Sequence, residues 1–272
     1  MSNWNITLYA GLTTMQTAQY NTSVAAANVA NAETDGYSAK QVSNQAQILG
    51  GVTVGVESAA LSSAVNSNLL ASLQTTAADS GYAKQLDSYL DRISETFGTV
   101  GDDNSLGEGL TGLEAALNTL ALDPASLSDR EVVLAEAEAL TQLMNSLSRD
   151  IQDQRAAADS DLASGVEAAN QLLQTLDQLN NDISAAEANG LSPLDLEDQR
   201  NSVLLELSQL MEVSYFVDTD NRLNVYTSEG TALVTSSART LSYDPAGTVT
   251  TATSFNAISV DGKDITGEIN NG

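Results

Sequence analysis

Carboxylates are the side chains with which this sequence could perform acid–base chemistry. The 272 residues include no cysteine and no histidine, which excludes thiol nucleophiles, imidazole bases, disulfides and zinc fingers. Asp and Glu number 36 and Lys and Arg number 10, so the formal net charge is −26. Such a charge repels phosphate groups, and we therefore expect neither nucleic acid nor a membrane surface as a partner.

Pairs of carboxylates occur at Asp102 and Asp103 and at Asp159 and Asp161. Both pairs fall on polar loops or helix faces, without apolar residues that would converge into a pocket, so we interpret them as solvated surface. We expect no catalytic residue, no metal ligand and no cofactor. A carboxylate enzyme stays open as the weakest functional alternative.

Two short motifs could mark a ligand site, and each has a simpler structural interpretation. Residues 107–112 read GEGLTG, which matches the dinucleotide-binding pattern literally but follows no predicted strand, so we interpret it as a helix start. Residues 218–221 read DTDN and could open a calcium loop. Arg222 and Leu223 stand where an EF-hand needs an oxygen ligand and a glycine, which favours a turn between strands.

The first element is predicted to be a helix over residues 5–31. Its apolar stripe repeats as in a heptad seam. The stripe is narrow and partly polar, so the helix needs a partner in water, although an ordinary amphipathic surface helix fits the pattern equally well. The seam positions are Leu8, Leu12, Met15, Gln19, Thr22, Ala26 and Val29.

A small β-hairpin is predicted after this helix. Asp35–Gly36 breaks the helical pattern, and the stretches 41–49 and 52–56 have strand character. They flank Gly50–Gly51, a pair that suits a tight two-residue turn.

Three helical segments are predicted to follow the hairpin. Helical periodicity resumes near Leu61 and stops at Gly98, and leucines over residues 106–120 predict a short helix. Ser128 opens a capping-box pattern, and a heptad register without proline continues over residues 128–186. At the usual rise per residue this is a rod of roughly 85–90 Å, far longer than an average globular helix.

The last part of the chain changes from helical to alternating periodicity. Asn189–Gly190 ends the rod, and Ser192–Pro193 starts another helix with proline at its first position. From Val213 onward the alternation predicts a small antiparallel β domain. Its strands are expected at 213–217, 222–226, 231–235, 239–243 and 258–260.

The predicted fold class is mainly α. We expect an elongated, coiled-coil-like helical rod with an N-terminal heptad helix, a small β-hairpin and a C-terminal small antiparallel β domain. The expected domains are an axial helix at 1–35, the helical rod at 36–212 and the β domain at 213–272.

One run of residues is unusual enough to indicate a family. Residues 28–38 read NVANAETDGYS directly after the heptad helix. This run resembles the Asn-(Ile/Val)-Ala-Asn-x-x-Thr-x-Gly-Tyr signature of bacterial flagellar axial proteins. A helix C-terminus that stops at Gly36 explains the same residues. Ala27 and Ala39–Lys40 depart from the signature, where Asn and Arg are common.

Later blocks are similar to the hook-associated protein 1 family, the hook–filament junction proteins. Residues 51–54, 117–134 and 179–183 each have a counterpart there, and residues 198–210 (DQRNSVLLELSQL) are the most specific. The resemblance stops near residues 267–269, beyond which members of the family continue. We therefore expect this chain to lack their C-terminal region.

The resemblance implies a structural subunit of the bacterial flagellum that joins hook to filament by helix packing. Its expected partners are the hook protein, the other junction protein, further copies in a ring, and the type III export apparatus with or without an export chaperone. The implied location is extracellular, reached without a cleaved signal peptide, which agrees with the absence of a basic residue before Lys40.

The predicted assembly interface follows from the same resemblance. An inner seam would line the tube against neighbouring subunits, and the signature run would fix the direction in which the chain leaves the helix. Another axial protein, such as the second junction protein or a flagellin, stays open, as does a coiled-coil adaptor unrelated to flagella. The expected interface residues are Leu8, Leu12, Met15 and Val29 in the seam and Asn28, Asn31, Thr34, Gly36 and Tyr37 in the signature run.

Overall fold

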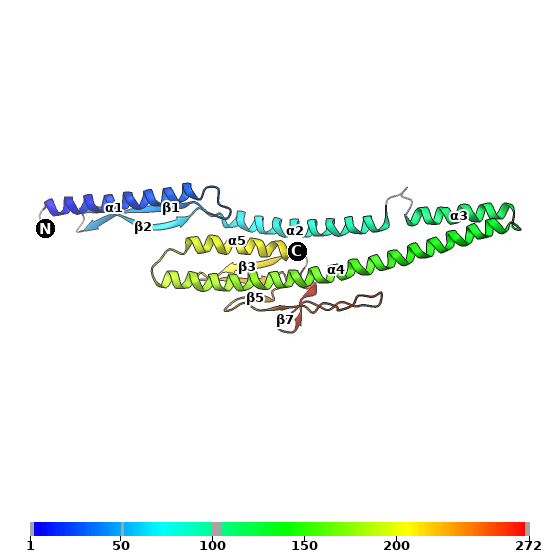
Figure 1. The fold of residues 1–272 in the computed structure, drawn as a ribbon. Coiled ribbons are helices and arrows are strands. Elements are labelled where there is room, and N and C mark those ends of the chain that lie inside the picture. The colour runs from blue at the N-terminus through cyan, green and yellow to red at the C-terminus, as the bar shows by residue number, and fades with distance from the viewer. Residues whose placement is uncertain (1–2, 50–51, 99–104, 270–272) are drawn as a thin grey trace. The chain divides into compact units, whose positions relative to one another are not determined.

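The computed structural model describes residues 3–49, 52–98 and 105–269, which fold mainly into helices with three small antiparallel sheets (Figure 1). Contacts divide the chain into two compact units, and two long helices contribute residues to both. Within the described ranges, every helix is too short or too polar to cross a membrane. The first unit comprises residues 1–79, 169–240 and 268–272, and the second comprises residues 80–168 and 241–267.

The N-terminal helix and the hairpin are both present, as predicted. Helix α1 spans Asn3–Ala30. Strand β1 (Lys40–Leu49) pairs antiparallel with β2 (Val52–Ser63), and α1 lies along the hairpin (Figure 1). The predicted turn at residues 50–51 lies outside the described residues.

The prediction that helical structure resumes near Leu61 is wrong. Leu61 still belongs to β2 and pairs with Val42, beyond a register shift at Ser43. Helix α2 (Ser67–Phe97) begins later, after Asn66, whose side chain accepts hydrogen bonds from the first turn. Cross-strand pairing therefore outweighed the local spacing of apolar residues.

Helix α1 covers the hairpin with the face opposite its heptad seam. The Thr17 hydroxyl donates to the Val56 carbonyl at 3.1 Å, and a Cβ on Gly55 would overlap the Thr13 hydroxyl. Small side chains thus let the helix approach the strands closely, and the hairpin supports α1 from the face opposite the seam, which itself stays uncovered. The covered or half-covered residues are Ile6, Ala10, Thr13, Thr17, Asn21, Val24 and Asn28.

Helices α3 (Leu106–Leu122) and α4 (Leu127–Ala188) are the predicted short helix and rod. Helix α4 is continuous over 62 residues, which confirms the prediction of one long helix. Its first turn is capped by Ser126, whose hydroxyl accepts from the Asp129 amide at 3.3 Å. The predicted cap at Ser128 is therefore wrong, because both serines stand three residues before an acidic residue and the spacing alone fits either.

The chain turns sharply between α4 and the next helix, α5 (Leu194–Leu210). Gly190 ends α4 with φ of +70°, as its position predicted. Pro193 is the residue just before α5, one position earlier than predicted. On α5, Leu207 is buried, whereas Leu210 is 37% exposed.

The core of the first unit lies between the C-terminal part of α4, helix α5 and a three-stranded sheet of order β3–β4–β5. The strands are β3 (Val213–Val217), β4 (Leu223–Thr227) and β5 (Ala232–Val234). The predicted heptad register of this part of α4 is confirmed by burial. The side chains with almost no exposure are Leu173, Leu176, Ile183, Leu204, Leu207, Leu223, Val225, Leu233 and Val234.

A second C-terminal sheet belongs to the second unit, followed by a short 3-10 turn at Thr266–Glu268. It consists of β6 (Leu241–Ser242), β7 (Ser259–Val260) and β8 (Lys263–Asp264). The residues of the predicted β domain form two small antiparallel sheets, one in each unit. The division into domains 1–35, 36–212 and 213–272 remains a prediction.

Candidate assembly site

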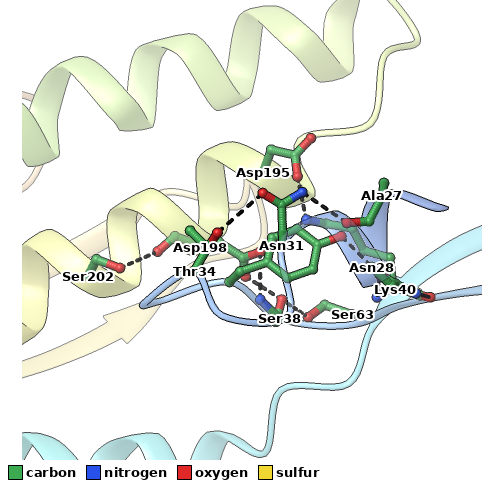
Figure 2. A network of polar contacts seen from close by, with 11 residues as sticks. Ala27, Asn28, Asn31, Thr34, Ser38, Lys40, Ser63, Asp195, Asp198 and Ser202 are labelled. Atoms are coloured by element: carbon green, nitrogen blue, oxygen red, sulfur yellow. Dashed lines mark hydrogen bonds and ion pairs between the residues drawn. The ribbon is translucent and has the colours of Figure 1, made fainter. Parts of the chain in front are cut away.

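The two stretches most specific to the family resemblance, residues 28–38 and 198–210, meet in the first unit (Figure 2). Asn28 joins the end of α1 to the start of β1. Its Oδ1 accepts from the Lys40 amide and from the Tyr37 hydroxyl, each at 2.9 Å, and its Nδ2 donates to the Lys40 carbonyl at 2.8 Å. The side chain therefore pairs with β1 much as a neighbouring strand would.

Asn31 and Thr34 shape the turn that follows α1 (Figure 2). Asn31 Nδ2 donates to the Ala27 carbonyl at 2.9 Å, and the Thr34 amide donates to the Asn31 carbonyl at 3.0 Å. The Tyr37 amide then donates to the Thr34 carbonyl at 3.2 Å. Ala27 contributes its carbonyl to this turn, so the departure from the signature at this position leaves these hydrogen bonds in place.

Gly36 is required by both its backbone conformation and its surroundings. Its φ of +77° lies in the left-handed region that favours glycine. A Cβ at this position would overlap the hydroxyl of Ser202 on α5. That hydroxyl donates to the Asp198 carbonyl at 3.1 Å, so it is already engaged. The turn can approach α5 this closely because Gly36 has no side chain.

Two carboxylates of α5 receive the chain that leaves the turn. Asp198 accepts from the Ser38 amide at 3.1 Å and from the Ser38 hydroxyl (Figure 2). Lys40 Nζ donates to Asp198 at 3.1 Å and to Asp195, and it lies 4.0 Å from the centroid of the Tyr37 ring. Burial lowers the pKa of Lys40, but hydrogen bonds and charge from Asp195 and Asp198 outweigh it and hold the pKa above its ordinary value.

Arg200 fastens the same part of α5 to α4 and to the β3–β4 turn. Its guanidinium donates to Asn180 Oδ1 at 3.1 Å and to the Asn221 carbonyl at 2.6 Å. Asn180 in turn pairs with the backbone of Leu223, accepting from its amide at 2.8 Å and donating to its carbonyl at 2.9 Å. Burial lowers the pKa of Arg200, although Glu197 raises it. This cluster holds Asp198 in place for the contact described above.

The predicted seam of α1 is on the surface of the first unit. Leu8 is 66% exposed, Met15 is 65% exposed and Val29 is 78% exposed. Leu8, Leu12 and Met15 line a shallow apolar groove together with Trp4. Of the predicted interface residues, those of the signature run contact the chain itself or turn it, whereas those of the seam face outward.

Sequence reasoning missed the partners of the signature run. The sequence patterns point to none of Lys40, Asp195 and Ser202 as site residues, although Lys40 departs from the signature. Asp198 belongs to the specific stretch 198–210, but the stretch alone indicates no contact for it. The charge pattern contains one signal, because Lys40 is the first basic residue of a very acidic chain. The residues around Lys40 do not indicate its partners, which lie 155 and 158 residues away in the sequence.

The other chemical candidates have structural roles where they are described. Asp159 is buried and accepts from the Tyr243 hydroxyl and from the Ala246 amide at 2.8 Å. Burial, with the charge and hydrogen bond of Asp159, raises the pKa of Tyr243 to about 12. Asp161 accepts from the Tyr89 hydroxyl at 2.9 Å. The pair at residues 102–103 lies outside the described residues, and among the rest no group of three acidic side chains could hold a metal ion.

The two literal motifs are also parts of the fold. In residues 107–112, a Cβ on Gly109 would stand 3.3 Å from Leu140, so the glycine lets α3 approach α4. Residues 218–221 form the predicted turn between β3 and β4. The Asp218 carboxylate accepts from two backbone amides of the turn at 3.0 Å, and Asn221 has φ of +56°.

The fold and this site define a mainly helical protein in which an N-terminal helix and hairpin are held by polar contacts to α5. Residues 90–272 match the family described as "Flagellar hook-associated protein FlgK helical domain". Residues 8–37 match the family described as "Flagella basal body rod protein". This chain belongs to the family of FlgK flagellar hook-associated proteins.

Individual relatives agree with this assignment. The flagellar hook-associated protein 1 of Bacillus subtilis (strain 168) is 27% identical over 223 residues, which are 78% of this chain and 44% of that protein. The protein of the same description from Salmonella typhimurium is 28% identical over 153 residues, which are 55% of this chain and 28% of that protein. This chain therefore spans less than half the length of either relative.

A solved structure supports the fold. The structure of the flagellar hook junction protein FlgK from Burkholderia pseudomallei matches with a TM-score of 0.56 at 23% identity. The match covers 75% of this chain and 37% of that chain. Matching by sequence to the helical domain and by structure to the fold favours the family over the alternatives of another axial protein or an unrelated adaptor.

Proposed function

We propose that this chain is a structural subunit of the bacterial flagellum that joins the hook to the filament without catalysis. The observation that carries the proposal is the free apolar seam of α1, beside a turn that matches the axial-protein signature. The hairpin covers the opposite face of the helix, so this seam is available for a neighbouring subunit. The names of the relatives support the same place in the flagellum.

The occupant that we propose for the seam is a helix of an adjacent subunit in the flagellar axis. Leu8, Leu12 and Met15 repeat at the heptad spacing that lets such side chains insert between those of a facing helix. Burying one side chain of this size contributes roughly 1.5–3 kcal/mol. One seam is weak alone, but a closed ring repeats the contact in every subunit.

The finer parts of the proposal concern partners and export. We infer that the chain contacts the hook protein and the other junction protein and that further copies complete the ring. We also infer that it reaches the cell exterior through the type III apparatus, without a cleaved signal peptide and with or without a chaperone. In this scheme Asn28, Asn31, Thr34, Gly36 and Tyr37 act inside the subunit, by directing α1 toward its neighbours.

The proposal is tested by changing the seam in the chromosomal gene. A Leu8→Asp and Met15→Asp double variant should leave hooks without attached filaments and abolish swimming, because two charges would be buried between helices. Leu191→Asp is the matched control, since Leu191 is 64% exposed in the loop between α4 and α5. Electron microscopy of hooks and a motility assay give the readout.

Two outcomes would contradict the proposal. Normal filaments on the double variant would show that the seam is not an assembly surface. Normal flagella after deletion of the gene would remove the flagellar role altogether.

A further inference from the structure

Lys40 occupies an unusual position for a basic residue in this chain. Its side chain is 6% exposed, in a protein with 10 basic and 36 acidic residues. A buried ammonium is costly unless charged partners satisfy it. Asp198 is also buried, with 9% of its side chain exposed, whereas Asp195 is 79% exposed. The ammonium thus lies between one buried and one exposed carboxylate.

The backbone of Lys40 is coupled directly to α1. Asn28, in the last turns of α1, holds both the amide and the carbonyl of Lys40. Farther along, the Thr17 hydroxyl holds the Val56 carbonyl of β2. Because α1 is joined to the hairpin at these separate points, the helix and the hairpin form one body. Contacts that hold the Lys40 side chain in place therefore also fix the orientation of α1.

The polar contacts from this body to α5 converge on a small area. The Ser38 amide and hydroxyl and Lys40 Nζ all reach carboxylates one helical turn apart on α5 (Figure 2). The Ser38 donors are adjacent to the turn and act close to a pivot. Lys40, two residues farther along the chain at the start of β1 and in contact with both carboxylates, can resist rotation about that pivot.

We propose that Lys40 is a positioning residue whose ammonium, held between Asp195 and Asp198, fixes the angle between α5 and the body formed by α1 and the hairpin. The inference rests on the proposed function, because this angle sets the direction in which the seam of α1 meets its neighbours. Without the ammonium, Asp198 keeps the Ser38 donors and Asp195 loses this ion pair. The body then rotates about the turn at residues 31–37.

The absence of cysteine makes a direct measurement straightforward. Ala25→Cys on α1 and Gln209→Cys on α5 replace exposed residues and accept one spin label each. Pulsed electron paramagnetic resonance then gives the distribution of distances between the two labels. Singly labelled proteins identify any distance that arises between two copies.

The variants separate charge from chain length. Lys40→Met removes the charge at similar length and should at least double the width of the distance distribution, while Lys40→Arg should keep it narrow. Lys84→Met is the matched control, because Lys84 is an exposed lysine on α2. Asp195→Ala removes the exposed carboxylate alone and should widen the distribution less than Lys40→Met does.

The outcomes decide the proposal in each case. A wider distribution of label distances in Lys40→Met and Asp195→Ala, but not in Lys84→Met, supports the proposal. If Lys40→Met unfolds the hairpin, Asp195→Ala still decides, since it leaves no buried charge unpaired. Unchanged widths in Asp195→Ala and in a folded Lys40→Met protein overturn it. The measurement uses the isolated chain, so failure of the proposed flagellar function would leave this result unaffected.

Discussion

The strongest stability prediction concerns Gly36, because the structure supplies a matched comparison at Gly190. Both glycines have φ values near +70°, at +77° and +70°. A Cβ on Gly36 would overlap the Ser202 hydroxyl, whereas a Cβ on Gly190 would meet nothing within 4 Å. Substitution by alanine therefore imposes the same backbone strain at both sites, but a steric conflict at Gly36 alone.

The expected magnitudes follow from these two terms. Left-handed backbone destabilises an alanine by roughly 1–2 kcal/mol. Alanine also lowers the conformational entropy of the unfolded chain, which stabilises the folded state by about 0.4–1 kcal/mol. Gly190→Ala should thus destabilise its loop by about 1 kcal/mol. In Gly36→Ala the Ser202 hydroxyl must also turn away from the Asp198 carbonyl, which adds about 0.5–1.5 kcal/mol for the lost hydrogen bond.

Hydrogen exchange measured by mass spectrometry is the suitable assay, because two compact units need not unfold together. Peptides that cover residues 37–48 report on Gly36→Ala, and peptides that cover residues 186–197 report on Gly190→Ala. Adding Ser202→Ala to Gly36→Ala removes the hydroxyl with which the new methyl group collides, so it should restore the share of the protection from exchange that this collision costs. Equal losses at the two glycines, or no recovery with Ser202→Ala, would refute the steric argument.

Three further predictions concern side-chain hydrogen bonds within each unit. Asn180→Leu should destabilise the first unit by about 2–4 kcal/mol in urea unfolding, because the amide and carbonyl of Leu223 lose their partner while buried; a loss below 1 kcal/mol would contradict this. The raised pKa of Tyr243 means that its contribution is complete below pH 10 and is lost as pH rises toward about 12. The melting temperature of the second unit should therefore fall more steeply between pH 10 and 12 in the parent protein than in Tyr243→Phe. Parallel plots of melting temperature against pH for the two proteins would be inconsistent with the Asp159 contact. Arg155→Lys should speed exchange in residues 241–267, because the guanidinium donates to two backbone carbonyls there, at 2.9 and 2.8 Å, and a single ammonium cannot reproduce that geometry; unchanged exchange would show that these bonds contribute nothing.

Periodicity alone determined much of the helical architecture. The long α4 helix followed from a heptad register without proline, and its C-terminal half buries apolar side chains such as Leu173 and Ile183. Gly190 ends the rod as predicted, because left-handed backbone is a local requirement. Gly36 also has left-handed backbone, but it lies in the turn that follows the end of α1 at Ala30. These features depend on neighbours within a few residues, so the sequence contains all the information they need.

The face of α1 that would be covered could not be derived in the same way. The heptad seam pointed to Leu8 and Met15, but the hairpin packs on the opposite face, where small residues such as Thr13 and Thr17 allow close approach. Close packing between backbones depends on the shapes of both partners. Hydropathy spacing records only where apolar side chains lie along one element.

Tertiary structure alone decided what the signature run contacts. The sequence by itself singled out residues 28–38 and 198–210 as separate specific stretches. Only the fold brings Ser38 and Lys40 into contact with Asp198. Only the fold also places Gly36 so close to Ser202 that a side chain at position 36 would not fit. The physical reason is that a hydrogen bond or an ion pair between residues some 160 positions apart leaves no periodic trace in the chain. Its geometry exists only after α4 and α5 have packed and placed their side chains.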